Sequence, residues 1–457
     1  SQRTIVSMNK GWKFTQKPVS DAFIFKYEDD EWLDVQLPHC WNNKDPFDDD
    51  NDYYRGMAWY RKHFTLTKEQ ANDKQVLLRF KGVNQVADVY LNGAFVVRHQ
   101  GGYTAFYADL TPFIKKDGSE NVLAVKVNNA QDPYIPPLDV GYVIYGGIYR
   151  DVDLMLLDPV HFATDEFGSE GLQVHSPNLY FDQPIVSAKA TIFNGSSKPS
   201  NVTITHQLFD AKNKLMNQFA ETALINTGAS FLFDSKSATI TSPILWSPEM
   251  PYLYRLQSTV SADGKIVDVL ENHVAFRNYH FNADSGFILN GQKYILKGTN
   301  RHQDLAGKGS ALSQEDHEQD LQIIKNMGCN FLRLAHYPQD PYVLKRADEL
   351  GLFIWEEIPL VNYMNTEPLF VGNCKTMIRE MIRQHYNYPS ILLWGSMNEI
   401  FLNDYYNNRA QKITDSVYGF KVRDIEKQLD ALVREEDPAR YSTLAIDRKS
   451  TRLNSSH

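Results

Sequence analysis

The first third of the chain consists of short runs in which hydrophobic and polar residues alternate, separated by turn residues. The run at 75–99, QVLLRFKGVNQVADVYLNGAFVVRH, shows this alternation, and its Asn92-Gly93 pair is typical of a tight hairpin turn. A period of two places every second side chain on the same face of a strand. The pattern predicts an all-β sandwich over residues 1–158, whose many aromatic residues favour a packed core over a sugar-stacking surface.

A second strand-rich block covers residues 159–279. The segment at 187–210, SAKATIFNGSSKPSNVTITHQLFD, has strand-like runs on both sides of a polar turn. In LWSPEMPYLYRLQSTV, at 245–260, prolines bound short strands. We therefore expect a small second β-sandwich.

After residue 280, short apolar runs alternate with segments of helical periodicity. The expected strands are KYILKG (293–298), CNFLRLAH (329–336), LFIWEEIP (352–359), ILLWGSMNEI (391–400) and YSTLAI (441–446). The helices expected between them lie around 313–328, 340–351, 370–386 and 415–436. This alternation builds a parallel sheet with helices outside it, and residues 280–446 would supply five of the eight strands of a (β/α)8 TIM barrel.

Capping residues mark the ends of the first two helices. Ser313 can cap the first together with Asp316, and Gly328 can end it. Asp340, followed by a proline, can open the second helix, and Gly351 can close it.

Composition limits the class of protein. The 457 residues exceed what one hydrophobic core can organise, which favours two to four domains. A net charge of −9 offers no basic face for nucleic acid, and no apolar stretch reaches the roughly 18 residues that span a membrane. The 3 cysteines are widely spaced, which indicates neither a disulfide framework nor a zinc site.

Polar side chains gather where the first four apolar runs end. They are Asn300, Arg301 and His302, Arg333 and His336, Glu356 and Glu357, and Asn398 and Glu399. In a TIM barrel the active site lies at the carboxyl ends of the strands, so the pattern predicts a site as well as a fold.

Two kinds of chemistry are open to such a site. His302, His336 and Glu357 could bind a metal ion, although they lack a fixed local spacing. Carboxylate chemistry is the other option: glycoside hydrolysis needs a proton donor and, when configuration is retained, a second carboxylate about 5 to 5.5 Å away. Glu399 is a plausible donor, with a pKa that burial against Trp394 or a second carboxylate could raise.

Six ordered motifs make the chain resemble glycoside hydrolase family 2, the β-galactosidases, β-glucuronidases and β-mannosidases. They are GGIYRDV (146–152), LWSPEMPYLY (245–254), LKGTNRHQD (296–304), NFLRLAHYPQDP (330–341), WEEIP (355–359) and WGSMNEI (394–400). The resemblance implies a jelly-roll sugar-binding domain at 1–158, an immunoglobulin-like sandwich at 159–279 and a TIM-barrel domain at 280–446. It further implies retaining hydrolysis of terminal β-D-galactosides. β-Glucuronidase, β-mannosidase and a non-catalytic carbohydrate-binding protein are the alternatives.

The resemblance also assigns roles to single residues. Glu399 resembles the general acid/base and Asn398 the residue that binds the sugar 2-hydroxyl. His302 and His336 resemble substrate-contacting histidines. Arg333 resembles the arginine that neighbours the nucleophile and contributes to the substrate site.

Two further positions depart from the family pattern. Family members often have a substrate-contacting aspartate six residues before the second glycine of GGIYRDV. That position is Gly141 here, and the nearest acid, Asp139, is the candidate for this role. Glu357 matches a carboxylate that binds Mg²⁺ in metal-dependent members, but Pro359 replaces the histidine expected two residues later. The resemblance therefore implies no required cofactor, with Mg²⁺ or Na⁺ as options at Glu357.

The resemblance places the nucleophilic glutamate on a strand well after the acid/base. We expect nothing after residue 446 of this chain to supply it, so that residues 1–446 alone would be inactive. The tail at 447–457, DRKSTRLNSSH, matches an in-frame translation of a common sequencing adapter and is expected to be non-native. The resemblance implies a soluble protein that is periplasmic or secreted and acts on a carbohydrate. It implies no nucleic-acid or membrane partner, and it allows a homo-oligomer of the full-length protein.

Overall fold

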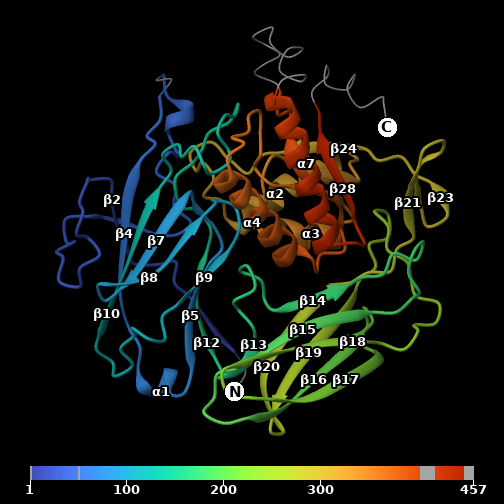
Figure 1. Cartoon of the computed structure of the whole chain (residues 1–457), viewed down its shortest axis with the longest axis horizontal. Coiled ribbons are helices and arrows are strands. Elements are labelled where there is room, and N and C mark those ends of the chain that lie inside the picture. The colour runs from blue at the N-terminus through green and yellow to red at the C-terminus, as the bar shows by residue number, and fades with distance from the viewer. Residues whose placement is uncertain (1–2, 50–51, 402–416, 447–457) are drawn as a thin grey trace.

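The computed structural model describes residues 3–49, 52–401 and 417–446, so the expected tail at 447–457 lies outside the described residues. Figure 1 shows two β-sandwiches and a parallel sheet with helices. The first sandwich and the parallel sheet each have a hydrophobic core of their own, and so does the second sandwich. The expected multidomain fold, with two sandwiches followed by TIM-barrel elements, is confirmed.

The first sandwich has a four-stranded sheet, in the order β1-β12-β5-β9, and a six-stranded sheet, in the order β3-β2-β4-β10-β7-β8. β11 and β6 form a separate two-stranded sheet, and all pairings are antiparallel. The elements are β1 (Thr4–Ser7), β2 (Trp12–Thr15), β3 (Leu33–Val35), η1 (Asp45–Phe47), β4 (Met57–Thr65), α1 (Lys68–Ala71), β5 (Gln75–Phe80), β6 (Val83–Asn84), β7 (Val86–Leu91), β8 (Ala94–Gln100), β9 (Phe106–Asp109), β10 (Glu120–Asn128), β11 (Gly147–Ile148) and β12 (Val152–Leu157).

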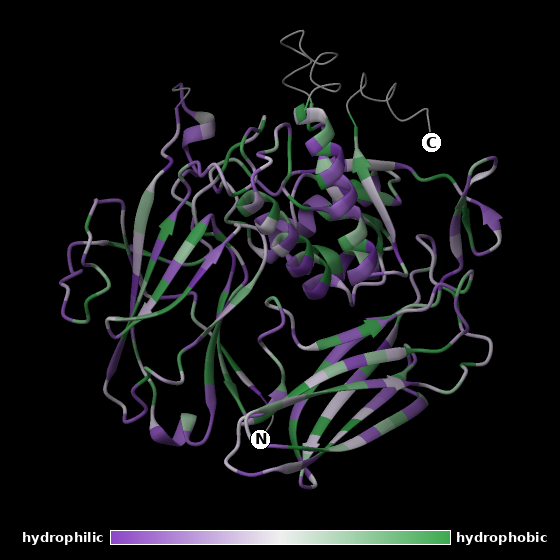
Figure 2. Ribbon diagram, in the orientation of Figure 1, coloured by the Kyte–Doolittle hydropathy of each residue, from purple (hydrophilic) through white to green (hydrophobic). Residues whose placement is uncertain are grey.

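The second sandwich packs two antiparallel sheets. One has β15 in the centre, paired with β13, β14 and β18, and the other has the order β17-β16-β19-β20. Its strands are β13 (Val160–Phe162), β14 (Leu172–His175), β15 (Ser187–Asn194), β16 (Ser200–Phe209), β17 (Leu215–Ile225), β18 (Ala229–Lys236), β19 (Tyr254–Ala262) and β20 (Lys265–Val274). Figure 2 shows hydrophobic and polar residues alternating along these strands, as a sheet with one buried face requires.

The parallel sheet has five strands in sequence order, β24-β25-β26-β27-β28, and it carries the helices of the third domain. Its elements are β24 (Gly298–Arg301), α2 (Gln314–Asn326), β25 (Phe331–Leu334), α3 (Pro341–Leu350), β26 (Phe353–Glu357), α4 (Pro368–His385), β27 (Ile391–Asn398), α7 (Val417–Glu436) and β28 (Tyr441–Ala445). A three-stranded sheet precedes it: β21 (Tyr279–Asn282), β22 (Gly286–Leu289) and β23 (Gln292–Lys293). Phe287 and Tyr279 of this small sheet pack against Phe353 in the parallel sheet.

The local signals in the sequence are largely confirmed. Asn92 has a φ of 53° between β7 and β8, as a two-residue hairpin turn requires. Ser313 and Asp316 form the expected capping box, Asp340 caps α3, and Gly351 ends that helix in the left-handed region.

The first parallel strand was predicted wrongly. It was expected at 293–298, but β24 covers Gly298–Arg301, and the apolar run precedes it as a connection from β23. Tyr294 and Leu296 of that run pack against the hydrophobic cluster that includes Phe353. Asn300 and Arg301 therefore belong to the strand itself.

No helix among the described residues is long and apolar enough to cross a membrane.

Candidate active site

Four of the predicted site residues form one hydrogen-bonded cluster at the carboxyl ends of β25, β26 and β27. The Nη2 of Arg333 donates to both carboxylate oxygens of Glu357, at 2.9 Å each, and its Nε donates to Oε2 at 3.1 Å. The Nδ1 of His336 donates to Oε1 of Glu357 at 2.6 Å. Arg333 also donates to Oδ1 of Asn398 at 2.7 Å, which fixes which end of that amide is the acceptor.

The strand geometry explains why these side chains meet. Glu357 pairs with Gly395 across β26 and β27, and a Cβ on Gly395 would lie 2.6 Å from Cβ of Glu357 and from Nε1 of Trp355. Only glycine leaves space for the carboxylate there. An irregularity in β27 between Gly395 and Asn398 then brings Asn398 to the same side as Arg333.

Glu399 follows β27 directly and has a backbone conformation that glutamate rarely adopts. Its φ is 48°, in the left-handed region, and its N–H donates to the carbonyl of Ala445 at 2.9 Å. The preceding N–H, of Asn398, donates to the carbonyl of Leu360 at 2.8 Å. A non-glycine residue held in this region costs about 1–3 kcal/mol, and such strain concentrates at functional sites.

His302 is held by a hydrogen-bond chain from the next strand. The N–H of Gln303 donates to Oη of Tyr337 at 3.0 Å, so the tyrosine hydrogen is directed to Nδ1 of His302, 3.3 Å away. Nδ1 then accepts and Nε2 carries the hydrogen. Burial, with a smaller effect from nearby His336, lowers the pKa of His302, which keeps the ring neutral near pH 7.

Tyr142 of the first domain completes this side of the site, and the sequence analysis missed it. Its ring lies 4.9 Å from that of His302 and 6.1 Å from that of His336. Its hydroxyl is buried and has no hydrogen-bond partner within the described part of the chain. Burial raises its pKa well above the usual value, so the hydroxyl keeps its hydrogen as a donor.

Asp139 is exposed, three residues before Tyr142. An acid was expected from this segment, whereas the side chain that lies against the two histidines is the ring of Tyr142. A polar aromatic residue shortly before GGIYRDV was the available signal.

Two other polar residues at the strand ends, Glu356 and Arg301, bind side chains of the helices. Glu356 is fully buried, where it accepts from Nδ1 of His385 on α4 at 2.8 Å. Arg301 donates to Asp320 on α2 and to Gln339, at 2.9 and 2.6 Å. Successive residues of a strand point to opposite faces, so Glu356 and Glu357 of β26 cannot both reach the site.

Trp394 also faces the helices. Its Nε1 donates to Asp437 at 2.8 Å, and it belongs to the core that β27 shares with α4 and α7. Trp394 was expected to bury Glu399, but side chains alternate between the two faces of β27, and that of Trp394 points away from the site.

Glu357 does not fit the metal site that the resemblance allows. Both of its carboxylate oxygens accept hydrogen bonds from Arg333, and one also accepts from His336. Among the described residues, no group of three or more His, Cys, Asp or Glu side chains could hold a metal ion. A cation at Glu357 would have to displace a guanidinium that already neutralises it.

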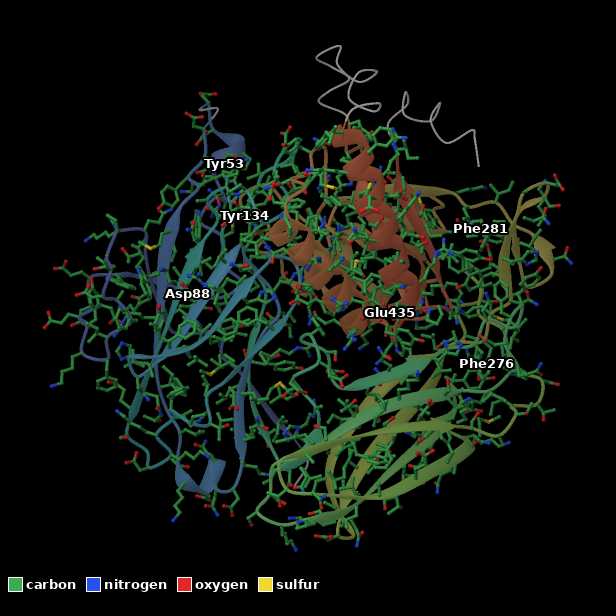
Figure 3. All side chains as sticks on the ribbon, viewed as in Figure 1. Tyr53, Asp88, Tyr134, Phe276, Phe281 and Glu435 are labelled. Atoms are coloured by element: carbon green, nitrogen blue, oxygen red, sulfur yellow. The ribbon has the colours of Figure 1, made fainter. Side chains whose placement is uncertain are left out.

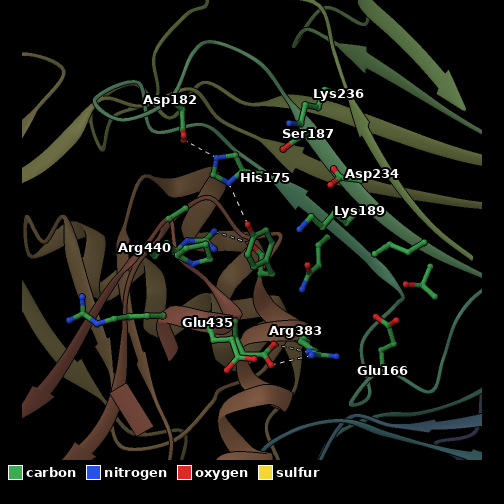
Figure 4. A pocket seen from close by; sticks show the side chains of 18 of the residues that line it. Glu166, His175, Asp182, Ser187, Lys189, Asp234, Lys236, Arg383, Glu435 and Arg440 are labelled. Atoms are coloured by element: carbon green, nitrogen blue, oxygen red, sulfur yellow. Dashed lines mark hydrogen bonds and ion pairs between the residues drawn. The ribbon is translucent and has the colours of Figure 1, made fainter. Parts of the chain in front are cut away.

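A cavity of about 1040 Å³ lies elsewhere, between β14, β15 and β18 of the second sandwich and α7 and β28. Figure 4 shows His175 there, hydrogen-bonded to Asp182 at 2.8 Å. Its lining contains none of the clustered site residues.

The first domain approaches α4 at Tyr134, which is labelled in Figure 3. The carbonyl of Tyr134 accepts a hydrogen bond from Asn373 of α4 at 2.8 Å.

A carboxylate, two histidines, an arginine and an amide thus lie together at the carboxyl ends of the parallel strands. Comparison with known proteins identifies the family. The sugar binding domain of glycosyl hydrolases family 2 matches residues 12–158, a second domain of glycosyl hydrolases family 2 matches 174–277, and the TIM barrel domain of that family matches 282–451. The chain belongs to glycosyl hydrolase family 2.

Individual relatives carry two different names. A β-glucuronidase of Bacteroides fragilis is 34% identical over 97% of this chain and 61% of its own length. A β-galactosidase of Thermoanaerobacter pseudethanolicus is 32% identical over 88% of this chain and 53% of its own length. The crystal structure of a Bacteroides uniformis β-glucuronidase superposes with a TM-score of 0.93 at 34% identity, over 99% of this chain and 54% of that one. The chain thus spans between half and two thirds of the length of these relatives.

Proposed function

We propose that the protein is a retaining exo-β-glycosidase in which Glu399 is the general acid/base. The strained φ of Glu399, beside an Asn398 whose amide is oriented by Arg333, is the observation that carries the proposal. Glu399 donates a proton to the glycosidic oxygen as the bond to the anomeric carbon breaks, and a second carboxylate forms the glycosyl-enzyme. Glu399 then takes a proton from water, whose oxygen displaces that carboxylate and releases the sugar.

The surrounding side chains would bind the sugar hydroxyls as donors. The amide nitrogen of Asn398, Nε2 of neutral His302 and the hydroxyl of Tyr142 are the candidates. Asn398 is adjacent to the acid/base, which suits a contact with the 2-hydroxyl, where hydrogen bonds strengthen in the transition state.

A β-D-galactoside is the substrate that this local chemistry favours. The charge of Arg333 is neutralised by Glu357, and His302 is neutral, so the site offers donors for hydroxyl groups. A β-D-glucuronide is the second candidate, because relatives at 34% identity bear that name. Its carboxylate would need a cationic partner.

The test compares the full-length product of this gene with its Glu399→Gln variant on nitrophenyl β-glycosides, galactoside and glucuronide included. Loss of general acid/base catalysis costs about 10²–10⁴-fold in rate. The loss in kcat/KM, which reports cleavage of the glycosidic bond, should be much smaller on a dinitrophenyl glycoside, whose leaving group needs no proton. Glu367→Gln, an exposed glutamate at the start of α4, is the matched control and should keep wild-type rates.

Hydrolysis of neither sugar would contradict the proposed function. An equal loss of kcat/KM on good and poor leaving groups would contradict the role of Glu399 as the acid. A preference for the glucuronide would show that the substrate is a β-D-glucuronide and not a β-D-galactoside. It would not contradict the proposed mechanism.

A further inference from the structure

Arg150 of the GGIYRDV motif extends from the first domain into the third. Its side chain is buried, with 2% of the residue exposed, between β11 and β12. Nη1 donates to two carbonyls of its own domain, those of Tyr103 at 3.0 Å and Lys81 at 3.3 Å. Nη2 donates across the boundary, to Oε1 of Gln303 at 3.2 Å and to the carbonyl of Pro338 at 2.8 Å.

These two acceptors lie next to the candidate site histidines. Gln303 directly follows His302, and Pro338 comes two residues after His336. Oε1 of Gln303 also accepts from the N–H of Asp340 at 3.0 Å. One guanidinium thus joins the loop after β24 to the loop after β25.

Two aromatic rings of the first domain support the same loops. Tyr103 stacks on Tyr337, with ring centroids 4.3 Å apart and an interplanar angle of 13°. The hydroxyl of Tyr337 is the group that binds Nδ1 of His302 and the N–H of Gln303. The Tyr149 ring lies 5.0 Å from the Arg150 guanidinium and donates its hydroxyl to the carbonyl of Gly102 at 2.6 Å.

The space and charge around Arg150 are matched to it. A Cβ on Gly82 would lie 2.8 Å from Cδ of Arg150. Burial alone would raise the pKa of Asp340, but Arg150, His317, the N–H of Tyr342 and Lys81 together lower it. Asp340 therefore stays ionised near the buried guanidinium.

We propose that Arg150 is a positioning residue of the candidate site: its guanidinium fixes the loops that follow β24 and β25, and with them His302 and His336, against the first domain. The effect on loop order stands on the geometry alone. The effect on catalysis rests also on the proposed function.

The first test is hydrogen exchange on this chain, because it does not depend on activity. Arg150→Met removes all four hydrogen bonds, and Arg150→Lys keeps the charge but cannot donate in both directions. Arg61→Lys is the matched control: Arg61 is as deeply buried, donating to Asp29 at 2.6 Å and to carbonyls such as that of Tyr27 at 3.1 Å, all within the first domain.

In Arg150→Met, exchange in segments 302–305 and 336–342 should be about tenfold faster or more, since hydrogen bonds to a charged group are lost. Arg150→Lys should lie between this variant and the wild type. Arg61→Lys should speed exchange in the first domain and leave both segments unchanged. Unchanged segments in Arg150→Met, or the same change in Arg61→Lys, would overturn the proposal.

Kinetics of the full-length protein provide the second readout. Misplacing groups that bind the sugar by about 1 Å can cost on the order of 100-fold in kcat/KM, and we expect this in Arg150→Met, with partial recovery in Arg150→Lys. Normal kcat/KM despite mobile loops would refute the positioning role. Wild-type inactivity would refute the proposed function, while the exchange result would still decide whether Arg150 orders the loops.

Discussion

Replacing Glu357 by glutamine tests whether the Arg333–Glu357 pair is a buried ion pair that stabilises the candidate site. The Glu357 side chain is fully buried, and the Arg333 side chain is 14% exposed. Removing one partner of a buried pair costs about 3–5 kcal/mol. We expect the lower end, about 3 kcal/mol, because Arg333 is partly exposed and keeps Asn398 and the Trp355 ring, 4.3 Å away, as partners.

Native-state hydrogen exchange of β26 measures this loss, since it reports the free energy of local opening. About 3 kcal/mol corresponds to exchange roughly 150-fold faster. The control is Glu271→Gln, the same chemical change in a pair with Arg255 that joins atoms 2.6 Å apart, with the Glu271 side chain 49% exposed. An exposed pair contributes about 1 kcal/mol or less, so exchange in β20 should change by less than about sixfold.

The two outcomes separate clearly. If β26 in Glu357→Gln changes no more than β20 does in Glu271→Gln, the pair is hydrated and does not hold Arg333 in place. The orientation of Asn398, which depends on Arg333, would then lose its physical basis.

Three further predictions concern the packing, the pH response and the helix caps. Gly395→Ala should destabilise the protein by about 1–3 kcal/mol, because the added Cβ would overlap Glu357. Gly372→Ala in α4 is the control: open space surrounds its Cβ, so this change should stabilise the protein by about 0.5–1 kcal/mol. Thermal unfolding of the two variants measures both effects. Burial lowers the pKa of His206 to about 4, so this ring stabilises the second sandwich above about pH 6.5 and should lose roughly 3 kcal/mol as the pH falls to about 4. Denaturant unfolding at both pH values should show this loss, and His206→Gln should reduce it; an equal loss in the variant would contradict the assignment. Ser313→Ala should cost about 1 kcal/mol, measured as faster exchange in the first turn of α2, and no change there would show that the capping box is not stabilising.

The sequence by itself determined the elements whose signals are local. The period of two in the sandwiches, the Asn92 turn and the caps at Ser313 and Asp340 each depend on neighbours within a few residues. Polar residues at successive strand ends also predicted the cluster of Arg333, Glu357 and Asn398, because parallel strands bring their carboxyl ends to one edge.

Only the tertiary structure decided which of those polar residues share the site. Glu356 and Glu357 are adjacent in sequence and equally acidic, yet one binds His385 on α4 and the other binds Arg333, since the register of the sheet sets the direction of each side chain. Tyr142 contacts the two histidines because the first domain packs there, a contact between residues more than a hundred positions apart. The start of β24 and the irregularity in β27 were set by packing and pairing with distant segments, which no local pattern encodes.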